Sequence, residues 1–413
     1  MADSSERFDM GLKLYNEAYL GLLSMGFSLM LSNGLSRAFL PILASQLNPT
    51  GILVGLVTSS WFLARAFMEL PSGFIVSKVG KRKLIISGFF LAMVGSLICA
   101  FSKNIYMLIG GVAIWGFGTG FFFMSSTLLL FGICRPKERS KAIGRLYTAE
   151  EIGAFVGAPI GGFLATFVGL SNVFFFSSSM LFLVFVMTGF SSSLRKADLE
   201  THVPSAFPFR EVLRGFESWA LIVLSFSNLS RLLIVQGLML TVFELYLRNF
   251  LNLGVEFIGL IMGVRTGGLI IGALVSEHLS SRVGTKRLLL GGLIVQAVCI
   301  YLYTLTRGFG YVTVLAVLDG CSSGFIFVCL VVFFSDVIPS SLRNEGMGIF
   351  RTFQDVGGVI GPISFIVLYE FFDVHVPFLA AVVLLFVNVC LVLSVKKYCI
   401  EKQCSVVEER ALV

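Results

Sequence analysis

Fourteen charged residues lie within stretches of sequence that are otherwise apolar, and these side chains are the ones that could do chemistry. A charged group at mid-membrane costs roughly 3 kcal/mol or more, so each one is expected to be paired or functional. Bases and acids are equal in number, so internal pairing can absorb them all and the sign of a substrate stays open. The bases are Arg37, Arg65, Arg145, Arg231, Arg248, Arg265 and Arg351, and the acids are Glu69, Glu150, Glu151, Glu244, Glu277, Asp319 and Asp355.

Three acid–base pairs among these residues are spaced four positions apart and therefore share a helix face. They are Arg65–Glu69, Glu244–Arg248 and Arg351–Asp355. Pairing within one helix is the simplest interpretation for Arg65 and Glu69. For Arg351 and Asp355 a functional role is equally open, because Asp355 is the counterpart of Glu151 in an internal repeat.

No arrangement of residues typical of an enzyme or a metal site is found in the sequence. It lacks a nucleophile–base constellation, a glycine-rich phosphate loop and metal-ligand spacing. The eight cysteines form no C-x-x-C pair and the three histidines are dispersed. We therefore expect no enzymatic activity, no cofactor, no disulfide and no bound metal.

Composition predicts that lipid surrounds these residues. Of 413 residues, 56% are hydrophobic and 13% are charged, whereas a soluble domain carries about 25% charged residues. Twelve apolar segments, each near the roughly 20 residues that cross a bilayer, predict an all-α membrane protein with 12 transmembrane helices. They cover approximately residues 17–45, 53–77, 84–102, 105–134, 142–169, 172–193, 218–247, 255–280, 287–306, 309–335, 346–369 and 376–395.

Basic residues are concentrated in alternate loops, which predicts the orientation of the chain. The loops after the second and fourth segments hold Lys81 and Arg139 with their basic neighbours, whereas the intervening loops hold little beyond Lys103 and Arg307. This pattern places both termini in the cytoplasm of a plasma-membrane protein. It also explains the net charge of +7 better than a nucleic-acid partner does.

The two halves of the chain repeat with an offset of 204 residues, which relates seven pairs of glycines. The pairs are Gly55–Gly259, Gly80–Gly284, Gly116–Gly320, Gly120–Gly324, Gly144–Gly348, Gly153–Gly357 and Gly157–Gly361. A repeat of six spans is a transporter architecture. We expect two pseudo-symmetric six-helix bundles at residues 1–194 and 218–396, a cytoplasmic linker at 195–217 and a cytoplasmic tail at 397–413.

The loop after the second segment resembles a signature of the major facilitator superfamily, G-x-x-x-D-[RK]-x-G-[RK]-[RK]. Gly73, Lys78, Gly80 and Arg82 match it, and Ser77 replaces its aspartate. The resemblance covers essentially the whole chain. It implies that this loop gates the transporter, with the charge contact of the aspartate absent or rebuilt.

The fifth segment resembles the motif of antiporter-type members, G-x-x-x-G-P-x-x-G-G. The motif is close to Gly153, Gly157, Pro159, Gly161 and Gly162, with Ala158 separating Gly157 from the proline, and Gly357, Gly361 and Pro362 belong to the corresponding segment of the second half. Gly153, Gly157 and Gly161 share one helical face, which a second helix can approach closely. The resemblance implies that this face meets the other bundle. Where such antiporters carry an arginine before Gly116, this chain has Val112.

The resemblance also implies that the first, fourth, seventh and tenth helices line a central cavity. On that basis the expected substrate-binding residues are Asn33, Arg37, Trp115, Thr119, Thr241, Glu244, Asp319 and Ser323. Asp319 lies near the midplane with no base in reach on its own helix, and Arg37 is the only base predicted on a matching cavity face. An Arg37–Asp319 pair would suit a polar or zwitterionic solute. An unpaired Asp319 would bind a cation or a proton.

Proton coupling is predicted for the carboxylates of the fifth, tenth and eleventh helices. Glu151 has no base four positions away, so desolvation favours its protonated form near neutral pH. We expect coupling through Glu150 and Glu151, through Asp319, and through Asp355 held ionised by Arg351.

The leading prediction is a secondary active transporter of small organic solutes that rocks two bundles about a midplane site. The antiporter-type motif implies proton-coupled efflux of amphipathic compounds, by a monomer whose partners are its small-molecule substrate, H⁺ and the lipid bilayer. The alternatives are metabolite uptake, facilitated diffusion, and a transport-dead receptor or assembly partner.

The predicted orientation can be tested at two cysteines that follow the last apolar segment, Cys399 and Cys404. A membrane-impermeant maleimide added to intact cells should leave both unlabelled, and permeabilisation should expose them, as measured by mass spectrometry. Labelling of both cysteines in intact cells would reverse the orientation.

Overall fold

The computed structural model describes residues 2–48, 50–69, 75–76, 79–134, 139–199, 219–305, 308–338 and 343–395. Every element assigned within these ranges is a helix, and twelve stretches are long and apolar enough to cross a membrane. The predicted all-α membrane fold with twelve spans is therefore confirmed. The predicted tail at 397–413 and the linker beyond residue 199 lie outside the described residues.

The first half of the chain contributes six spans. The first span is divided into α1 (Ala2–Arg37) and α2 (Leu40–Leu47), and Pro41 in the first turn of α2 favours the restart of the helix. The other helices are α3 (Gly51–Glu69), α5 (Lys81–Ala100), α6 (Ile105–Ile133), α7 (Arg139–Val168), α8 (Leu170–Phe190) and the short α9 (Ser192–Leu199).

The seventh span is the irregular one. It comprises α11 (Trp219–Leu233), the π-helix η2 (Ile234–Val242), the single turn α12 (Phe243–Leu245) and a second π segment, η3 (Tyr246–Phe250). Short π segments are rare and often lie at functional sites. The remaining helices are α13 (Val255–Val283), α14 (Thr285–Tyr303), α15 (Phe309–Val337), α16 (Arg343–Phe371) and α17 (Val376–Ser394).

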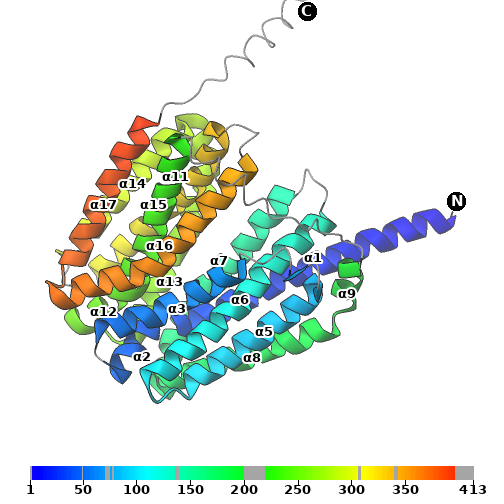
Figure 1. Cartoon of the computed structure of the whole chain (residues 1–413), viewed down its shortest axis with the longest axis horizontal. Helices are drawn as coiled ribbons and strands as arrows, with labels where there is room; N and C mark the ends of the chain where they lie inside the picture. The colour runs from blue at the N-terminus through cyan, green and yellow to red at the C-terminus, as the bar shows by residue number, and fades with distance from the viewer. Residues whose placement is uncertain are drawn as a thin grey trace, which may run out of the picture.

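Helices α1–α9 form an N-terminal bundle and α11–α17 a C-terminal bundle (Figure 1). The bundles meet where α2, α3 and α12 lie, and they diverge towards the end at which α1 begins and α17 ends. We name the first end the distal side and the second the terminal side. The two bundles thus form a V that opens on the terminal side.

The glycine face of α7 packs inside its own bundle, against α1. A methyl group at Gly157 would lie 2.5 Å from the carbonyl oxygen of Leu31 and 2.9 Å from Cα of Gly34. Gly153 and Gly161 approach the α1 backbone in the same way. The expectation that this face meets the other bundle is therefore wrong. The motif glycines instead hold α1 against α7, where small residues permit backbone contact in a membrane.

The second half repeats this arrangement between α16 and α11. Gly357 lies against the backbone of Leu229, and Gly361 against that of Leu233. The glycine offset of 204 residues therefore corresponds to equivalent helix contacts in the two bundles.

A different face of α7 meets the C-terminal bundle. Methyl groups at Gly162 and Gly263 would collide with Gly259 of α13 and with the Pro159 ring, respectively. The proline of the motif therefore lies at the contact between the bundles.

The helices α3 and α16 form the second contact between the bundles. Gly55 approaches the carbonyl oxygen of Pro362, and the Ser59 hydroxyl donates a 2.6 Å hydrogen bond to the carbonyl oxygen of Val359. Motif residues from both halves thus join the bundles on the distal side.

The loop motif is described only in part, because Gly73 and Lys78 lie outside the described residues. Gly80 begins α5 with φ +89°, a conformation that favours glycine. The Lys81 amide donates to Asp198 of α9 at 3.0 Å, so Asp198 supplies a carboxylate beside the motif whose own aspartate is replaced by Ser77. This contact lies within the N-terminal bundle.

Basic residues at the repeat-related starts of α5 and α14 hold the ends of α8 and α17. Arg82 donates to the carbonyl oxygen of Gly189 at 2.5 Å, and Lys286 donates to that of Leu393 at 3.0 Å. Both partners are separated by the same offset of 204 residues. These cations stabilise helix C-termini, which carry a partial negative charge.

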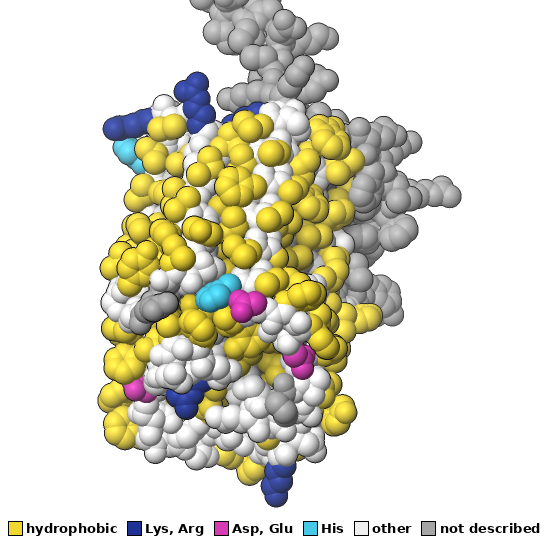
Figure 2. Space-filling model, turned by 90° about the vertical axis from the view of Figure 1, so that its left-hand side faces the viewer, with side chains coloured by type: hydrophobic (Ala, Val, Ile, Leu, Met, Phe, Trp, Pro, Cys, Tyr) yellow, Lys and Arg dark blue, Asp and Glu magenta, His cyan; other side chains and the backbone are white. Residues whose placement is uncertain are grey.

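The outer face of the C-terminal bundle is suited to lipid. Figure 2 shows hydrophobic side chains over most of the upper part of the view, with Lys and Arg side chains at its upper end and acidic and His side chains along its lower boundary. A wide apolar band between charged ends is what a bilayer requires.

The packing at Gly157 predicts a loss of stability on substitution. Gly157→Leu should lower the free energy of unfolding by about 1–3 kcal/mol, because the added side chain overpacks the α1–α7 contact. Thermal unfolding of the purified protein in detergent measures this change. Gly144→Leu is the matched control on the same helix, because no atom lies within 4 Å of a methyl group there. An equal effect of the two substitutions would contradict the packing role.

Candidate substrate and proton pathway between the bundles

Two arginines of the N-terminal bundle lie beside the aromatic rings of α3. The guanidinium carbon of Arg37 is 3.9 Å from the centre of the Trp61 ring and 5.1 Å from that of Phe62. The same carbon of Arg65 is 5.4 Å from each ring. Such cation–π contacts stabilise a charge that has left water. The rings of Trp61 and Phe62 therefore stabilise the charges of both arginines.

Arg65 forms an ion pair with Asp355 of α16, with 2.6 Å between Nη2 and Oδ1. This pair joins the bundles near the middle of the paired helices. The prediction that Arg351 holds Asp355 ionised is wrong, because the partner of Asp355 comes from the other bundle and Arg351 is exposed. The side chain of Glu69, the predicted neighbour of Arg65, lies outside the described side chains.

Polar contacts join the seventh span to the first and second spans. Arg37 donates to the neutral amide of Gln236 of η2 at 3.2 Å, and the Thr241 hydroxyl oxygen lies 3.3 Å from that of Thr58 of α3. Asn33, one turn before Arg37, is buried and donates to Met30. Asn33, Arg37 and Thr241 thus lie at or beside the interface between the bundles, where substrate contact was predicted.

Glu244 of α12 is fully buried, and neither of its carboxyl oxygens has a hydrogen-bond partner among the described residues. The charged side chain that interacts with it is Arg37. The carboxyl group lies in the single helical turn between the two π segments. A buried polar group without a partner is unusual and calls for a functional explanation.

Glu151 lies on α7 just outside the contact with α13 that Pro159 and Gly162 form. One turn away on the same face, Phe155 contacts Gly267 of α13. Glu151 therefore faces the gap where the bundles diverge. Its largest attraction is to Arg231 of the C-terminal bundle.

Arg231 is held in place on the other side of this gap. Its Nε donates to Asn228 at 3.2 Å, and its guanidinium carbon lies 5.1 Å from the Phe327 ring. Asn228 in turn donates to Gln354 at 3.1 Å. Glu151 and Arg231 are thus opposite charges on opposite bundles, with no ion pair within 4.0 Å between these two described residues.

Glu150 points away from the gap, into the N-terminal bundle. Its side chain is buried beside Gly26 of α1, and Oε1 has no hydrogen-bond partner in the described part of the chain. The adjacent carboxylates Glu150 and Glu151 therefore occupy different environments.

Asp319 is buried inside the C-terminal bundle and forms an ion pair with Arg265 of α13, with 2.5 Å between Oδ2 and Nε. Gln296 of α14 donates to Oδ1 at 3.2 Å. The expectation that Arg37 is the base available to Asp319 is wrong, because α13 provides it. Ser323, one turn along, is also buried, and its hydroxyl has no partner among the described atoms.

Trp115 and Thr119 lie inside the N-terminal bundle, and the expectation that they line the central cavity is wrong. Both are fully buried. Trp115 packs edge-on against Phe174 of α8, and Thr119 donates to the carbonyl oxygen of Gly116 in its own helix. On α6 the residue that reaches the interface is Phe123, whose ring lies 5.8 Å from Arg65.

The internal repeat relates the Arg265–Asp319 pair to two residues of the N-terminal bundle. The offset of 204 residues relates Asp319 to Trp115 and Arg265 to Trp61. The contact between α3 and α6 near Gly116 therefore has a counterpart between α13 and α15 near Gly320. Once the contact of Trp61 with α6 is known, the offset places Arg265 beside Asp319.

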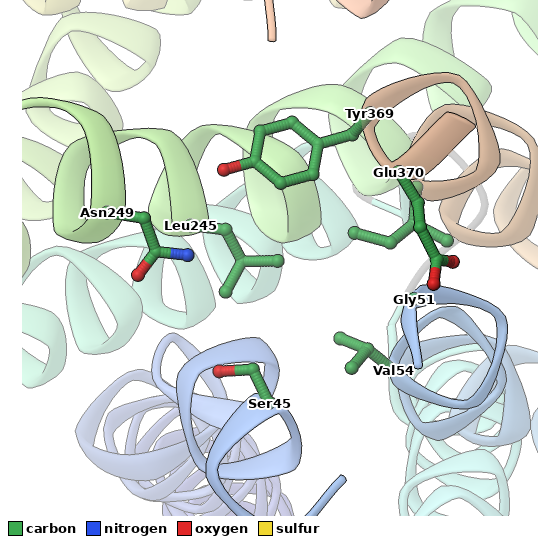
Figure 3. Close-up of a pocket in the computed structure, with 8 residues that line it drawn as sticks. Ser45, Gly51, Val54, Leu245, Asn249, Tyr369 and Glu370 are labelled. Carbon is green, nitrogen blue, oxygen red and sulfur yellow. The ribbon is translucent and has the colours of Figure 1, made fainter. Parts of the chain in front are cut away.

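A cavity of about 300 Å³ lies between the bundles on the distal side. Figure 3 shows Ser45 and Val54 of the N-terminal bundle facing Leu245, Asn249 and the α16 residues across it. Glu370 closes one edge, because a methyl group at Gly51 would lie 2.5 Å from its carboxylate oxygen. Its charge lies near the start of α3, whose N-terminus carries a partial positive charge. Among the described residues no cluster of three or more potential metal ligands occurs.

The comparison with protein-family models gives a match to the Major Facilitator Superfamily over residues 22–241 and 224–398. The chain belongs to this superfamily. It is 25% identical over 334 residues to the multidrug resistance proteins MdtG of Salmonella choleraesuis and Salmonella typhimurium, which covers 79% of this chain and 82% of each relative. The fold and the transporter class predicted from the sequence are therefore confirmed.

Solved structures of other superfamily members share the fold. A mutant of the nucleoside transporter NupG aligns with a TM-score of 0.75 at 14% identity, over 91% of this chain and 99% of that one. A bacterial homologue of the human lysosomal transporter Spinster, in an inward-facing and unoccupied conformation, aligns with a TM-score of 0.73 at 13% identity, over 92% and 96%.

The buried ion pair of the C-terminal bundle predicts a specific double-mutant result. Asp319→Asn should destabilise the protein by about 3–5 kcal/mol, because it leaves the Arg265 charge unpaired in the bundle. Adding Arg265→Gln should restore much of the lost thermal stability, whereas adding Arg37→Gln should not. Rescue by Arg37→Gln alone would contradict the geometry.

Proposed function

We propose that this chain is a secondary active transporter that exports amphipathic organic compounds from the cytoplasm in exchange for protons. The multidrug resistance relatives and the motif of the fifth span support this class of substrate. The observation that carries the proposal is the placement of Glu151 and Arg231 on opposite sides of the terminal-side gap. An acid and a base face each other there without contact, so a proton or a solute can enter between them.

The terminal side is proposed to face the cytoplasm, because the basic loops gather there. In this orientation the V of Figure 1 opens inward. The distal contacts, which the glycines of α3, α7, α13 and α16 form, close the opposite side. The protein is then in an inward-facing state, as a monomer in the plasma membrane.

The transport cycle follows from the positions of the charges. A compound enters from the terminal side between Glu151 and Arg231, with Phe123 and Phe327 as apolar contacts. Rocking of the bundles opens the distal contacts and brings Glu151 closer to Arg231. A proton on Glu151 removes its charge, so proton binding and the binding of a cationic compound at this carboxylate exclude each other. That exclusion couples export to the proton gradient.

The proposal predicts proton-driven uptake of ethidium into inverted membrane vesicles. An imposed gradient, acidic inside, should drive accumulation by wild-type protein, measured by fluorescence. Glu151→Gln should remove the dependence on the gradient and weaken ethidium binding to the purified protein, because the amide can neither exchange a proton nor attract the cation.

The control for this experiment is Asp336→Asn, which removes an exposed carboxylate at the end of α15. It should transport as wild type does. If the gradient drives no accumulation of ethidium, or of any in a panel of other amphipathic cations and anions, into wild-type vesicles, proton-coupled efflux is contradicted. A gradient-dependent Glu151→Gln variant would remove Glu151 from the coupling step.

A further inference from the structure

The buried carboxyl group of Glu244 has surroundings that the transport proposal leaves unexplained. The Glu244 side chain is fully buried. Both carboxyl oxygens lack a hydrogen-bond partner among the described residues. An ionised carboxylate in such a place costs far more than a neutral acid. The neutral, protonated acid is therefore the form that suits this site.

The elements packed around Glu244 offer few charges. Neither α2 nor η2 contains a charged residue, and η3 contains Arg248, which is exposed and donates to the carbonyl oxygen of Leu253 at 3.2 Å. Arg37 at the end of α1 is the charge that interacts with Glu244. It is the group that could neutralise an ionised Glu244.

Arg37 is occupied elsewhere in this conformation. It stacks on Trp61 and donates to the neutral amide of Gln236, and it is repelled by Arg65. Neither contact is with an acid, so Arg37 is held by interactions that a carboxylate could outcompete. Arg37 and Glu244 are thus the two halves of an ion pair that is not formed while Glu244 keeps its proton.

We propose that Glu244 is a second proton-binding site, and that its proton controls an ion pair with Arg37 between the two bundles. When the proton leaves the carboxyl group for water, the carboxylate attracts the Arg37 guanidinium away from Trp61 and Gln236. The resulting pair joins α1 to α12 and strengthens the closed distal side. When the proton returns, the pair is lost and the bundles can part there.

The local backbone suits this role. Glu244 lies in one helical turn between π segments, and the Thr241 hydroxyl donates at 2.8 Å to the carbonyl oxygen of Gln236, five residues earlier. A π segment shifts the register of a helix and often occurs at a working site. As a coupling site Glu244 rests on the proposed proton-driven cycle; as a proton-binding group it does not.

Trp61 is a natural reporter of the proposed exchange, because Arg37 stacks on it only while Glu244 is protonated. The tryptophan emission of the purified full-length protein in detergent should change with pH in a transition that Trp61→Phe removes. Glu244→Gln should abolish this transition. Asp373→Asn, which removes an exposed carboxylate on the distal side, and Glu151→Gln should both keep it.

Each outcome decides the proposal. Persistence of the Trp61 transition in Glu244→Gln, or its absence in wild type, would overturn it. If Glu244→Gln fails to fold by size-exclusion chromatography, Glu244→Asp replaces it, and a shifted midpoint supports the site while an unchanged midpoint overturns it. Wild-type vesicles that ignore a proton gradient would refute the proposed function alone, because the fluorescence titration needs neither gradient nor substrate.

Discussion

A charge within a membrane protein must be neutralised by something close to it, and the architecture of this chain depends on how that is done. Asp319 and Arg265 neutralise each other inside one bundle, and Arg65 and Asp355 do so between bundles. Arg37 rests on an aromatic ring instead. The Asp319–Arg265 pair lies inside one bundle and does not have to break when the bundles part. The Arg65–Asp355 pair and the Arg37–Trp61 contact lie at the interface between the bundles, so they can change during transport.

Close backbone packing is what allows these charges to be held at defined positions. The hydrophobic effect does not drive the association of helices within a lipid bilayer, so their association relies on van der Waals contact and hydrogen bonds. Gly157 brings α7 onto α1, while Ala158, Pro159 and Gly162 on a neighbouring face of the same helix meet α13. The motif of α7 therefore has two roles on two faces of the helix. One face packs against α1 within the N-terminal bundle, and the other contacts α13 of the C-terminal bundle.

Much of the fold could be predicted from the sequence, because hydropathy and glycine spacing depend on the local chain alone. Twelve spans, the repeat and the family followed from them. Side-chain partners could not be predicted in this way. Asp355 pairs with Arg65, 290 residues away, rather than with Arg351 on its own helix. Trp115 faces α8 rather than the centre, because small rotations of a helix decide which face is inside. The sequence also contained no sign of the π segments beside Glu244.

The interface charges have opposite polarity in the two halves of the membrane. On the distal side the N-terminal bundle supplies the cation Arg37, and the C-terminal bundle supplies the acid Glu244. Towards the terminal side the N-terminal bundle supplies Glu151 and the C-terminal bundle supplies Arg231. Rocking that opens one side closes the other, so attraction lost between Arg37 and Glu244 is replaced by attraction between Glu151 and Arg231. The two end states can then be close in free energy, and a proton or a solute at one carboxylate is enough to choose between them.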